Sequence, residues 1–171
     1  MFKNIRNIDT QLAFYMRTYY KHHILNEIMK FISFCGDFGM SWLIIILITN
    51  IYEPTRQMSI KMLIALISAT LIGQITIKSI VRRKRPCHTY SDLPLLIPTP
   101  SDLSFPSGHT TSSFACSTIL FLFYPVAGII GYIYALLTGI SRLYLFVHYL
   151  SDVVCGMILG ISIGIIVFHC I

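Results

Sequence analysis

The sequence predicts an all-α protein, a polytopic membrane helix bundle of about six transmembrane helices with an N-terminal interfacial helix. Three observations predict this class. Of the 171 residues, 55% are hydrophobic and only 12% are charged, whereas a soluble globular domain has about 25% charged residues. Long uncharged runs alternate with short polar turns, and helices satisfy their own backbone polar groups in lipid. The length allows one membrane domain, residues 1–171, and leaves no room for a separate soluble domain.

The first two elements are an interfacial helix and a short span. Residues 1–23 mix apolar and basic side chains, which is typical of a helix lying in the membrane interface. Their positive charge predicts the cytoplasmic side. Residues 24–35 are interrupted by Glu27 and Lys30, so we expect a short or partly shielded first span, ended by the turn-prone GDFG at 36–39.

Two further spans precede a long loop. Residues 40–52 form an apolar run in which Trp42 and Tyr52 are placed as interface anchors. The third span covers residues 62–77. Residues 82–106 are a polar, proline-rich loop that begins with a block of four basic residues.

The second half of the chain predicts a helical hairpin and a final span. Residues 110–141 are 32 residues without a charge, and as one helix they would be about 48 Å long, beyond a hydrocarbon core of about 30 Å. Pro125 is the natural break, which gives two spans of about 16 residues each. The last span covers residues 153–171.

This hairpin brings three polar segments to one membrane face. The segments are KSIVRRKRP at 78–86, FPSGHT at 105–110 and SRLYLFVHYLSD at 141–152. Three of their basic residues stand out as candidate ligands: Lys78, Arg85 and Arg142. Convergent cations of this kind indicate a site for a phosphate-like anion.

The spacing within the segments predicts local geometry. Lys78 and Arg85 are seven residues apart, so they share a face about 10 Å apart if the third span continues to Arg85 and ends at Pro86. His148 and Asp152 are four apart, so on a helix the carboxylate can orient one imidazole nitrogen and leave the other free. Arg142 cannot share that face, and a turn is expected between Arg142 and His148.

The helix that follows FPSGHT has a suitable start for anion binding. Ser107 can cap it, and Gly108 allows close approach to its free backbone N–H groups. Ordinary explanations remain open for each feature taken alone. Lys78 could extend to the interface, His109 could be a solvated side chain, and His148 with Asp152 could be a simple ion pair.

Taken together, the three segments resemble the three-part signature of the type 2 phosphatidic acid phosphatase superfamily. The matching pattern is Lys, six residues and Arg-Pro; Pro-Ser-Gly-His; then Ser-Arg, five residues, His, three residues and Asp, over residues 78–152. The size and the uncharged hairpin are similar to the six-span bacterial members. Those include undecaprenyl diphosphate phosphatases and type B phosphatidylglycerophosphate phosphatases.

The resemblance implies roles for the site residues. His148 would be the nucleophile that forms a phosphohistidine, Asp152 would orient it, and His109 would protonate the leaving oxygen. The phosphate-binding groups would be Lys78, Arg85, Ser107, Gly108 and Arg142. No metal and no other cofactor is implied, and Asp152 is the one acidic residue inside the motifs, whereas a two-metal site needs several carboxylates.

The predicted function is lipid phosphate hydrolysis, with undecaprenyl diphosphate in carrier-lipid recycling as the preferred substrate. The alternative is phosphatidylglycerophosphate or phosphatidic acid, and an alternative of another class is a catalytically silent membrane protein or anion transporter. The partners are a lipid phosphate and membrane lipids; nucleic acid is not expected, because the basic residues are not spread over one solvated face. The oligomeric state is left open.

The predicted location is the bacterial cytoplasmic membrane, with the active site on its extracytoplasmic face. A cytoplasmic N-terminus and six spans would place the loop 82–106 outside. Attraction to anionic lipid headgroups or to the substrate would then explain Arg82, Arg83 and Lys84. Cys35 and Cys87 would both face an oxidising compartment, where they could pair.

Overall fold

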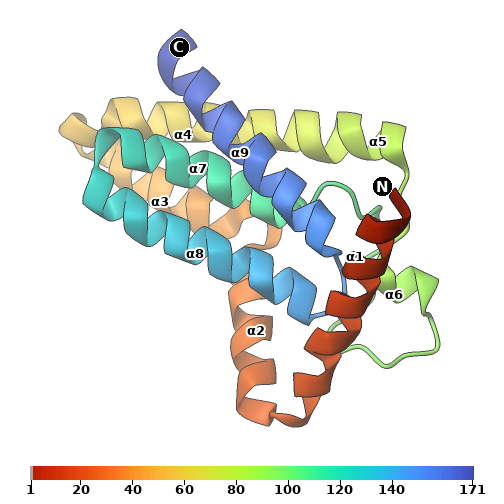
Figure 1. Cartoon of the computed structure of the whole chain (residues 1–171). Helices are drawn as coiled ribbons and strands as arrows, with labels where there is room; N and C mark the ends of the chain where they lie inside the picture. The colour runs from red at the N-terminus through yellow and green to blue at the C-terminus, as the bar shows by residue number, and fades with distance from the viewer. Residues whose placement is uncertain (1) are drawn as a thin grey trace.

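The computed structural model describes residues 2–171, with side chains from Asn4 onward. Met1, the first residue of the predicted interfacial helix 1–23, lies outside the described residues. The long helices are α1 (Phe2–Arg17), α2 (His23–Cys35), α3 (Met40–Ile51), α4 (Arg56–Ala69), α7 (Gly108–Phe123), α8 (Pro125–Tyr144) and α9 (Leu150–Cys170). The shorter ones are η1 (Thr18–Lys21), η2 (Asp37–Gly39), η3 (Glu53–Thr55), the π-helical η4 (Thr70–Ile77), α5 (Lys78–Val81) and α6 (Pro86–Thr89). The predicted all-helical bundle is confirmed (Figure 1).

Helix α7 is the centre of the bundle. It packs most extensively against α8 and α9 and also against α4. Small residues permit this close packing: a β-carbon at Gly160 of α9 would lie 2.4 Å from the carbonyl oxygen of Thr111. The indole N–H of Trp42 on α3 donates to the Ser113 hydroxyl of α7 over 3.1 Å.

The hairpin predicted from the uncharged run is present. Helix α7 ends at Phe123 and α8 begins at Pro125, because proline is favoured in the first turn of a helix and cannot continue the one before it. His109 and Arg142 consequently lie at the same end of the bundle and line one cavity.

The arrangement of the first spans differs from the prediction. Glu53–Thr89, Pro125–Tyr144 and Leu150–Cys170 are long and apolar enough to cross a membrane, and α2 with η2 and α3 could make one bent span. The two parts of that pair are bent by 49°. The prediction of two separate spans at 24–35 and 40–52 is therefore not confirmed, because a bend of this size does not reverse the chain. The count of six spans is not confirmed.

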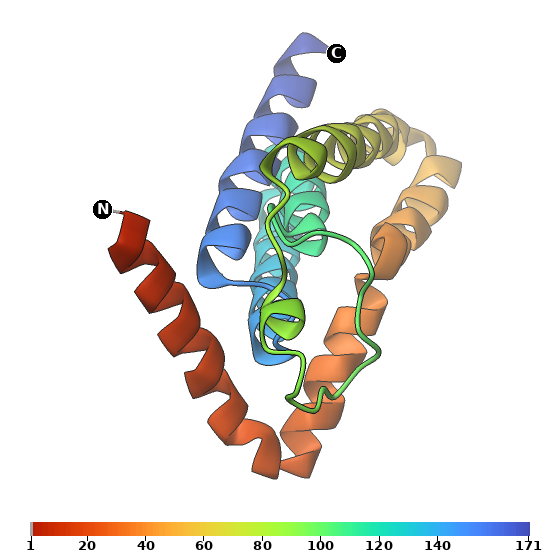
Figure 2. The ribbon, with the colours of Figure 1, turned by 90° about the vertical axis from the view of Figure 1, so that its right-hand side faces the viewer.

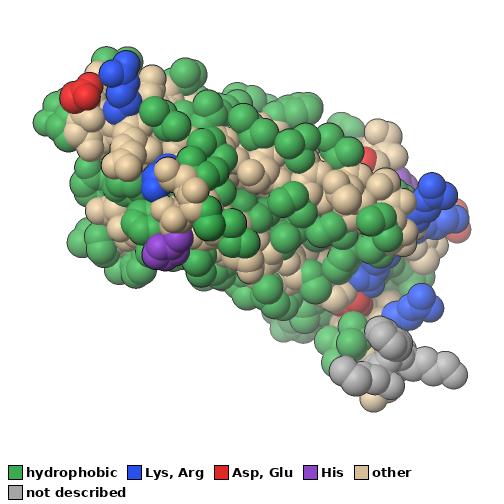
Figure 3. Space-filling model, turned by 90° about the horizontal axis from the view of Figure 1, so that it is seen from above, with side chains coloured by type: hydrophobic (Ala, Val, Ile, Leu, Met, Phe, Trp, Pro, Cys, Tyr) green, Lys and Arg blue, Asp and Glu red, His purple; other side chains and the backbone are tan. Residues whose placement is uncertain are grey.

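Polar and apolar surfaces are distributed as a membrane protein requires. On the face in Figure 3, charged side chains gather toward the two ends of the molecule, and hydrophobic side chains cover the region between them. Helix α7 has 16 residues and is about 24 Å long, which is shorter than a hydrocarbon core of about 30 Å. It is sheltered by its neighbours, since most of its side chains are buried.

Helix α1 lies across the end of the bundle that carries the loop 82–106 (Figures 1 and 2). Its Asp9 carboxylate accepts hydrogen bonds from Arg83 of that loop and from Ser151 of α9. The predicted interfacial helix and the loop therefore share one face. The expectation that they lie on opposite faces is wrong, because no span separates α1 from α2 and α3 is the first helix to run lengthwise through the bundle.

A second hydrophobic cluster supports the turn after α8. Leu145, Phe146 and Val147 are fully buried there, and the Phe146 ring lies 5.6 Å from that of Phe14 on α1. Phe146 has a positive φ of 62°, so the chain reverses sharply between Arg142 and His148, as expected. This packing fixes the position from which His148 enters the bundle.

Candidate active site

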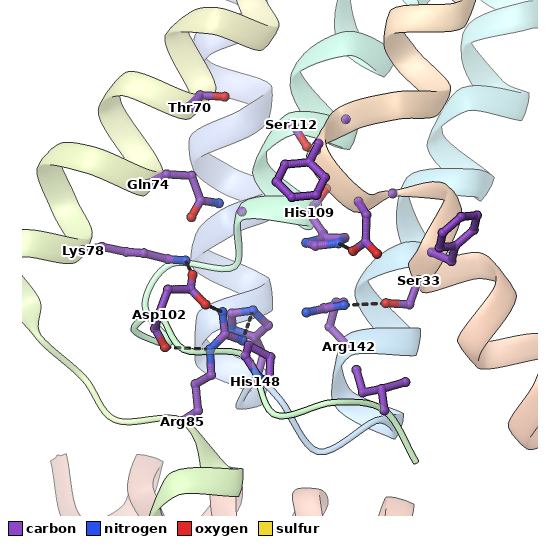
Figure 4. Close-up of a pocket in the computed structure, with 18 of the residues that line it drawn as sticks. Ser33, Thr70, Gln74, Lys78, Arg85, Asp102, His109, Ser112, Arg142 and His148 are labelled. Carbon is purple, nitrogen blue, oxygen red and sulfur yellow. Dashed lines mark hydrogen bonds and ion pairs between the residues drawn. The ribbon is translucent and has the colours of Figure 1, made fainter. Parts of the chain in front are cut away.

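A cavity of about 880 Å³ opens at the end of the bundle next to the loop 82–106. Side chains from α2, η4, α5, α7, α8 and the loop line it (Figure 4). The predicted site residues that line it are Lys78, Arg85, Gly108, His109, Arg142 and His148. Ser107 and Asp152, the other two, are fully buried behind this lining. The structure thus brings three distant segments to one place.

The backbone reaches Arg85 by a route that differs from the prediction. Helix α5 ends at Val81, and Arg82 adopts a left-handed conformation with a φ of 50°. The next residues are extended, and Pro86 begins α6 instead of ending a helix. Lys78 and Arg85 therefore do not share a helix face, and a non-helical segment delivers the arginine.

Asp102 joins the two cations and was not identified from the sequence. Its carboxylate forms an ion pair with Lys78 and accepts from Arg85 Nη2 over 2.6 Å (Figure 4). Partial burial opposes ionisation, but hydrogen bonding and the charges of Lys78 and Arg85 lower the pKa of Asp102 to about 2. A carboxylate is therefore bound where the cations could hold a phosphate.

Arg142 is the third cation, and it is only partly satisfied. The side chain is buried, and its Nη1 donates to the Ser33 hydroxyl of α2. Its Nε has no hydrogen-bond partner within the part of the chain that the structure describes. A buried donor without a partner is costly, and an anion in the cavity would satisfy it.

His148 lies against the cation cluster with 1% of its surface exposed. Its Nε2 is 2.9 Å from Arg85 Nη1. Burial, followed by the charges of Arg85 and Arg142, holds the pKa of His148 well below its usual range. A neutral imidazole with an available nitrogen lone pair is the form that can act as a nucleophile.

Asp152 does not bond directly to His148 in this structure. His148 precedes α9, which begins at Leu150. The prediction that His148 and Asp152 share one helix is therefore wrong. Their Nδ1 to Oδ2 distance is 3.6 Å, beyond an ordinary hydrogen bond. The Ser104 hydroxyl lies beside both, 2.5 Å from Oδ2 and 3.5 Å from Nδ1. Asp152 also accepts from the Tyr149 backbone N–H over 2.8 Å.

Arg83 is a second site residue that the sequence did not reveal. Its guanidinium donates to Asp152 Oδ1 over 2.8 Å and to Asp9 Oδ2 over 2.7 Å, and it lies 4.1 Å from the centre of the Tyr149 ring. The prediction that it faces anionic lipid is wrong. Arg83 is 25% exposed but both of its partners are buried, so its guanidinium points into the interior, where it offsets the charge of the two carboxylates.

Helix α7 begins where the sequence predicted, but the predicted capping hydrogen bond from Ser107 is not formed. Ser107 is the N-cap residue, yet its hydroxyl makes no cap bond and accepts instead from Thr110 Oγ1 over 2.9 Å. A β-carbon at Gly108 would be 1.0 Å from the amide nitrogen of Gln74, so a side chain at this position would require Gln74 to move. Gln74, on the π-helical η4, thus lies over the start of α7 (Figure 4).

His109 has a carboxylate partner from outside the three motifs. Its Nε2 is 2.7 Å from Asp37 Oδ1, in the GDFG segment that the sequence indicated only as a turn. Asp37 and Ser33 show that α2 and η2 complete the cavity. Both lie outside the three motifs, so the motif analysis did not identify them.

The described residues contain neither the possible disulfide nor a metal-binding cluster. Cys35 and Cys87 are free thiols in the structure, so the possible disulfide is not formed. Among residues 2–171, no group of three or more His, Cys, Asp or Glu side chains is placed to hold a metal ion.

The family is decided by a match over the region that holds all eight predicted site residues. Residues 59–171 match the family model described as the PAP2 superfamily. The chain belongs to the PAP2 superfamily. The resemblance inferred from the three motifs is thereby confirmed.

Known PAP2 proteins resemble the chain over most of its length. The undecaprenyl-diphosphatase of Sulfolobus acidocaldarius is 33% identical over 80% of this chain and 66% of its own. The decaprenylphosphoryl-5-phosphoribose phosphatase of Mycobacterium tuberculosis is 36% identical over 80% of this chain and 75% of its own. Both relatives are phosphatases, the enzyme class predicted from the sequence.

A solved PAP2 structure has the same fold. The transmembrane phosphatidylglycerolphosphate phosphatase from Bacillus subtilis aligns with a TM-score of 0.79 at 26% identity, over 98% of this chain and 86% of its own. The apolar helices and these relatives identify the PAP2 chain as a membrane protein.

Proposed function

We propose that this PAP2 protein is a metal-independent lipid phosphate phosphatase that works through a phosphohistidine, with undecaprenyl diphosphate as its substrate in carrier-lipid recycling. One observation carries the proposal: His148 Nε2 lies 2.9 Å from Arg85 in a cavity also lined by Lys78, Arg142 and His109. Two relatives named for polyprenyl substrates support the choice of a polyprenyl carrier.

In the first proposed step, His148 Nε2 attacks the phosphorus atom. The N–H of Arg85 that now points at Nε2 turns to a phosphoryl oxygen, so the nitrogen lone pair is released. His109 donates a proton to the leaving oxygen as the P–O bond breaks. With a diphosphate substrate, the leaving group is the lipid monophosphate.

In the second step, His109 removes a proton from a water molecule, which attacks the phosphohistidine. The P–N bond breaks, inorganic phosphate forms, and His148 returns to its neutral form. Charge on the phosphoryl oxygens would be held by Lys78, Arg85 and Arg142 and by the start of α7 at Ser107 and Gly108.

The walls of the cavity suit a lipid. Phe34, Phe38, Leu66 and Ala69 line one side, between α2 with η2 and the end of α4. Phe38 is 95% exposed, which is expected of a side chain in contact with lipid. We infer that the hydrocarbon chain lies on this side while the phosphate occupies the cation cluster.

The experiment that tests the function is phosphate release from a panel of lipid phosphates in detergent with a chelator present. The panel contains undecaprenyl diphosphate, phosphatidylglycerophosphate and phosphatidic acid. We expect hydrolysis without added metal, fastest for the polyprenyl diphosphate. Preference for phosphatidylglycerophosphate would favour the alternative that the likeness to the Bacillus subtilis phosphatase supports.

A second assay tests the location, for which we propose the extracytoplasmic face of the bacterial cytoplasmic membrane, with α1 on that same face. A short-chain, water-soluble phosphate ester is given to intact and to permeabilised cells. An outward-facing site hydrolyses it at the same rate in both. Hydrolysis that appears only after permeabilisation would contradict this face.

Asp102→Asn is expected to strengthen inhibition by inorganic phosphate about threefold to tenfold. The carboxylate holds Lys78 and Arg85, and incoming phosphate must displace it. The measurement is the inhibition constant of phosphate at neutral pH, with Asp92→Asn on the same loop as the matched control. Weaker inhibition would instead mean that Asp102 keeps the cations in place for phosphate.

A further inference from the structure

A network of buried charges ties α1 to the catalytic face. Asp9 Oδ1 accepts from the Ser151 backbone N–H over 2.9 Å, and Asp9 Oδ2 accepts from the Ser151 hydroxyl over 2.6 Å and from Arg83 Nη2 over 2.7 Å. Arg83 Nη1 continues to Asp152 Oδ1 over 2.8 Å. The network therefore runs without a gap from the first helix to the carboxylate beside His148.

The network contains two carboxylates, Asp9 and Asp152, and one guanidinium, Arg83. Asp9 is 2% exposed and Asp152 is 0% exposed. Within the described residues, Arg83 is the one basic side chain in ion-pair contact with either carboxylate, apart from His148 itself. Two carboxylates sharing one guanidinium give a buried cluster with one net negative charge.

That negative charge lies where the proposed reaction needs it. When the neutral imidazole of His148 takes up a phosphoryl group at Nε2, the ring becomes positively charged. Its Nδ1 is 3.6 Å from Asp152. Without the charge of Asp9, Arg83 would neutralise Asp152 fully, and the charged ring would lose stabilisation.

The contacts of Asp9 also fix the position of Asp152. Ser151 immediately precedes Asp152 in the first turn of α9, and its hydroxyl also accepts from Arg83 over 2.6 Å. Asp9 thus holds the backbone and the guanidinium on either side of the catalytic carboxylate. Asp9 lies outside residues 59–171, the region that the family model matches.

We propose that Asp9 is a positioning residue, which acts through Arg83 and Ser151 to orient Asp152 and to leave a net negative charge beside His148. This inference rests on the proposed function, because it assigns Asp9 to the step in which His148 is phosphorylated. It makes α1 part of the catalytic apparatus and not only a membrane anchor.

The test compares Asp9→Asn with the unaltered full-length protein in lipid phosphate hydrolysis. We expect kcat to fall about tenfold, while KM and the inhibition constant of inorganic phosphate change less than about twofold, because no phosphate ligand is altered. Removing a negative charge near His148 lowers its pKa, so the acid limb of the profile of kcat/KM against pH moves to lower pH. The charged or titratable groups that act on His148 are Lys78, Arg85, His109 and Arg142, together with Asp152 at 3.6 Å; Asp102 faces it only through Arg85, and none of these groups is changed.

Two variants control for a purely structural effect. Arg17→Gln removes another attachment of α1, the bond from Arg17 Nη2 to the Pro94 carbonyl over 3.0 Å, and should leave kcat unchanged. Asp9→Glu keeps the charge and should keep the acid limb in place. Equal kcat in Asp9→Asn, or a lower kcat with an unshifted acid limb and a lower melting temperature, would overturn the inference.

If Asp9→Asn folds poorly, Ser151→Ala is measured in its place. This variant retains both carboxylates and removes the hydroxyl that links Asp9 and Arg83. A lower kcat with unchanged phosphate inhibition would support the inference, and unchanged kcat would overturn it. If the unaltered protein releases no phosphate from any lipid, the proposed function fails and this inference falls with it.

Discussion

Replacing His148 with alanine is expected to lower phosphate release by roughly 10⁴-fold or more, as loss of a nucleophile does in other enzymes. The imidazole is the one group proposed to accept the phosphoryl group, and the cations that line the cavity cannot replace it. The measurement is inorganic phosphate released from the preferred lipid at saturating concentration. Radiolabelled substrate should also leave a label on the unaltered protein during turnover and none on His148→Ala.

Two controls make this result specific. His88→Ala, a histidine on α6 that does not line the cavity, should leave phosphate release unchanged. His148→Ala should still be stabilised against thermal unfolding by inorganic phosphate, since Lys78, Arg85 and Arg142 remain. Undiminished turnover in His148→Ala would reject the mechanism. Absence of turnover in the unaltered protein would favour a silent protein or an anion transporter.

Asp152→Asn is expected to lower kcat by about a hundredfold to a thousandfold while KM changes little. The carboxylate accepts from Arg83, Ser104 and the Tyr149 backbone N–H. An amide would turn an N–H group toward one of these donors and would remove the charge that stabilises a phosphorylated His148. The measurement is the separate change in kcat and KM.

Ser104→Ala is the matched control for Asp152→Asn. It removes one hydrogen bond to the carboxylate and keeps its charge, so we expect a loss of turnover well below that of Asp152→Asn. Equal losses in kcat and in substrate affinity for Asp152→Asn would contradict an orienting role and would indicate that Asp152 holds the site together.

The sequence was sufficient to predict those parts of the fold that depend on local residue preferences or on the thickness of the membrane. An uncharged run too long for one span had to fold back, and Pro125 marked the place. The three motifs then had to meet, because the hairpin and the loop return the chain to the same end. These arguments depend on helix length and bilayer thickness and not on side-chain packing.

The sequence was insufficient where a residue departed from its usual conformation. Arg82 is left-handed without being glycine, so the continuous helix expected up to Arg85 is interrupted. The GDFG segment was identified as a turn, but the 49° bend between α2 and α3 depends on Phe38 and Gly39, both with positive φ. Turn-forming residues indicate a break and do not give its angle.

The remaining site residues could not be found from the sequence because they depend on contacts across the fold. Asp9, Ser33 and Asp37 lie in the first 40 residues, far from the motifs that they contact. Asp102 and Ser104 lie next to FPSGHT, where an acidic residue and a serine in a polar loop are unremarkable. Their roles become visible only when both sides of the cavity are in place.

The contacts of α1 and α2 also determine the order in which the site can be completed during synthesis. Asp9 and Ser151 are separated by 142 positions, and Ser33 and Arg142 by 109. Helices α1 and α2 are therefore synthesised long before the helices that they contact. Ser151 and Asp152 belong to α9, so until α9 arrives Asp9 lacks its bonds to Ser151 and Arg83 lacks its bond to Asp152. The contacts that hold α1 on the bundle through Asp9 and Ser151 can therefore form only after α9 has been made.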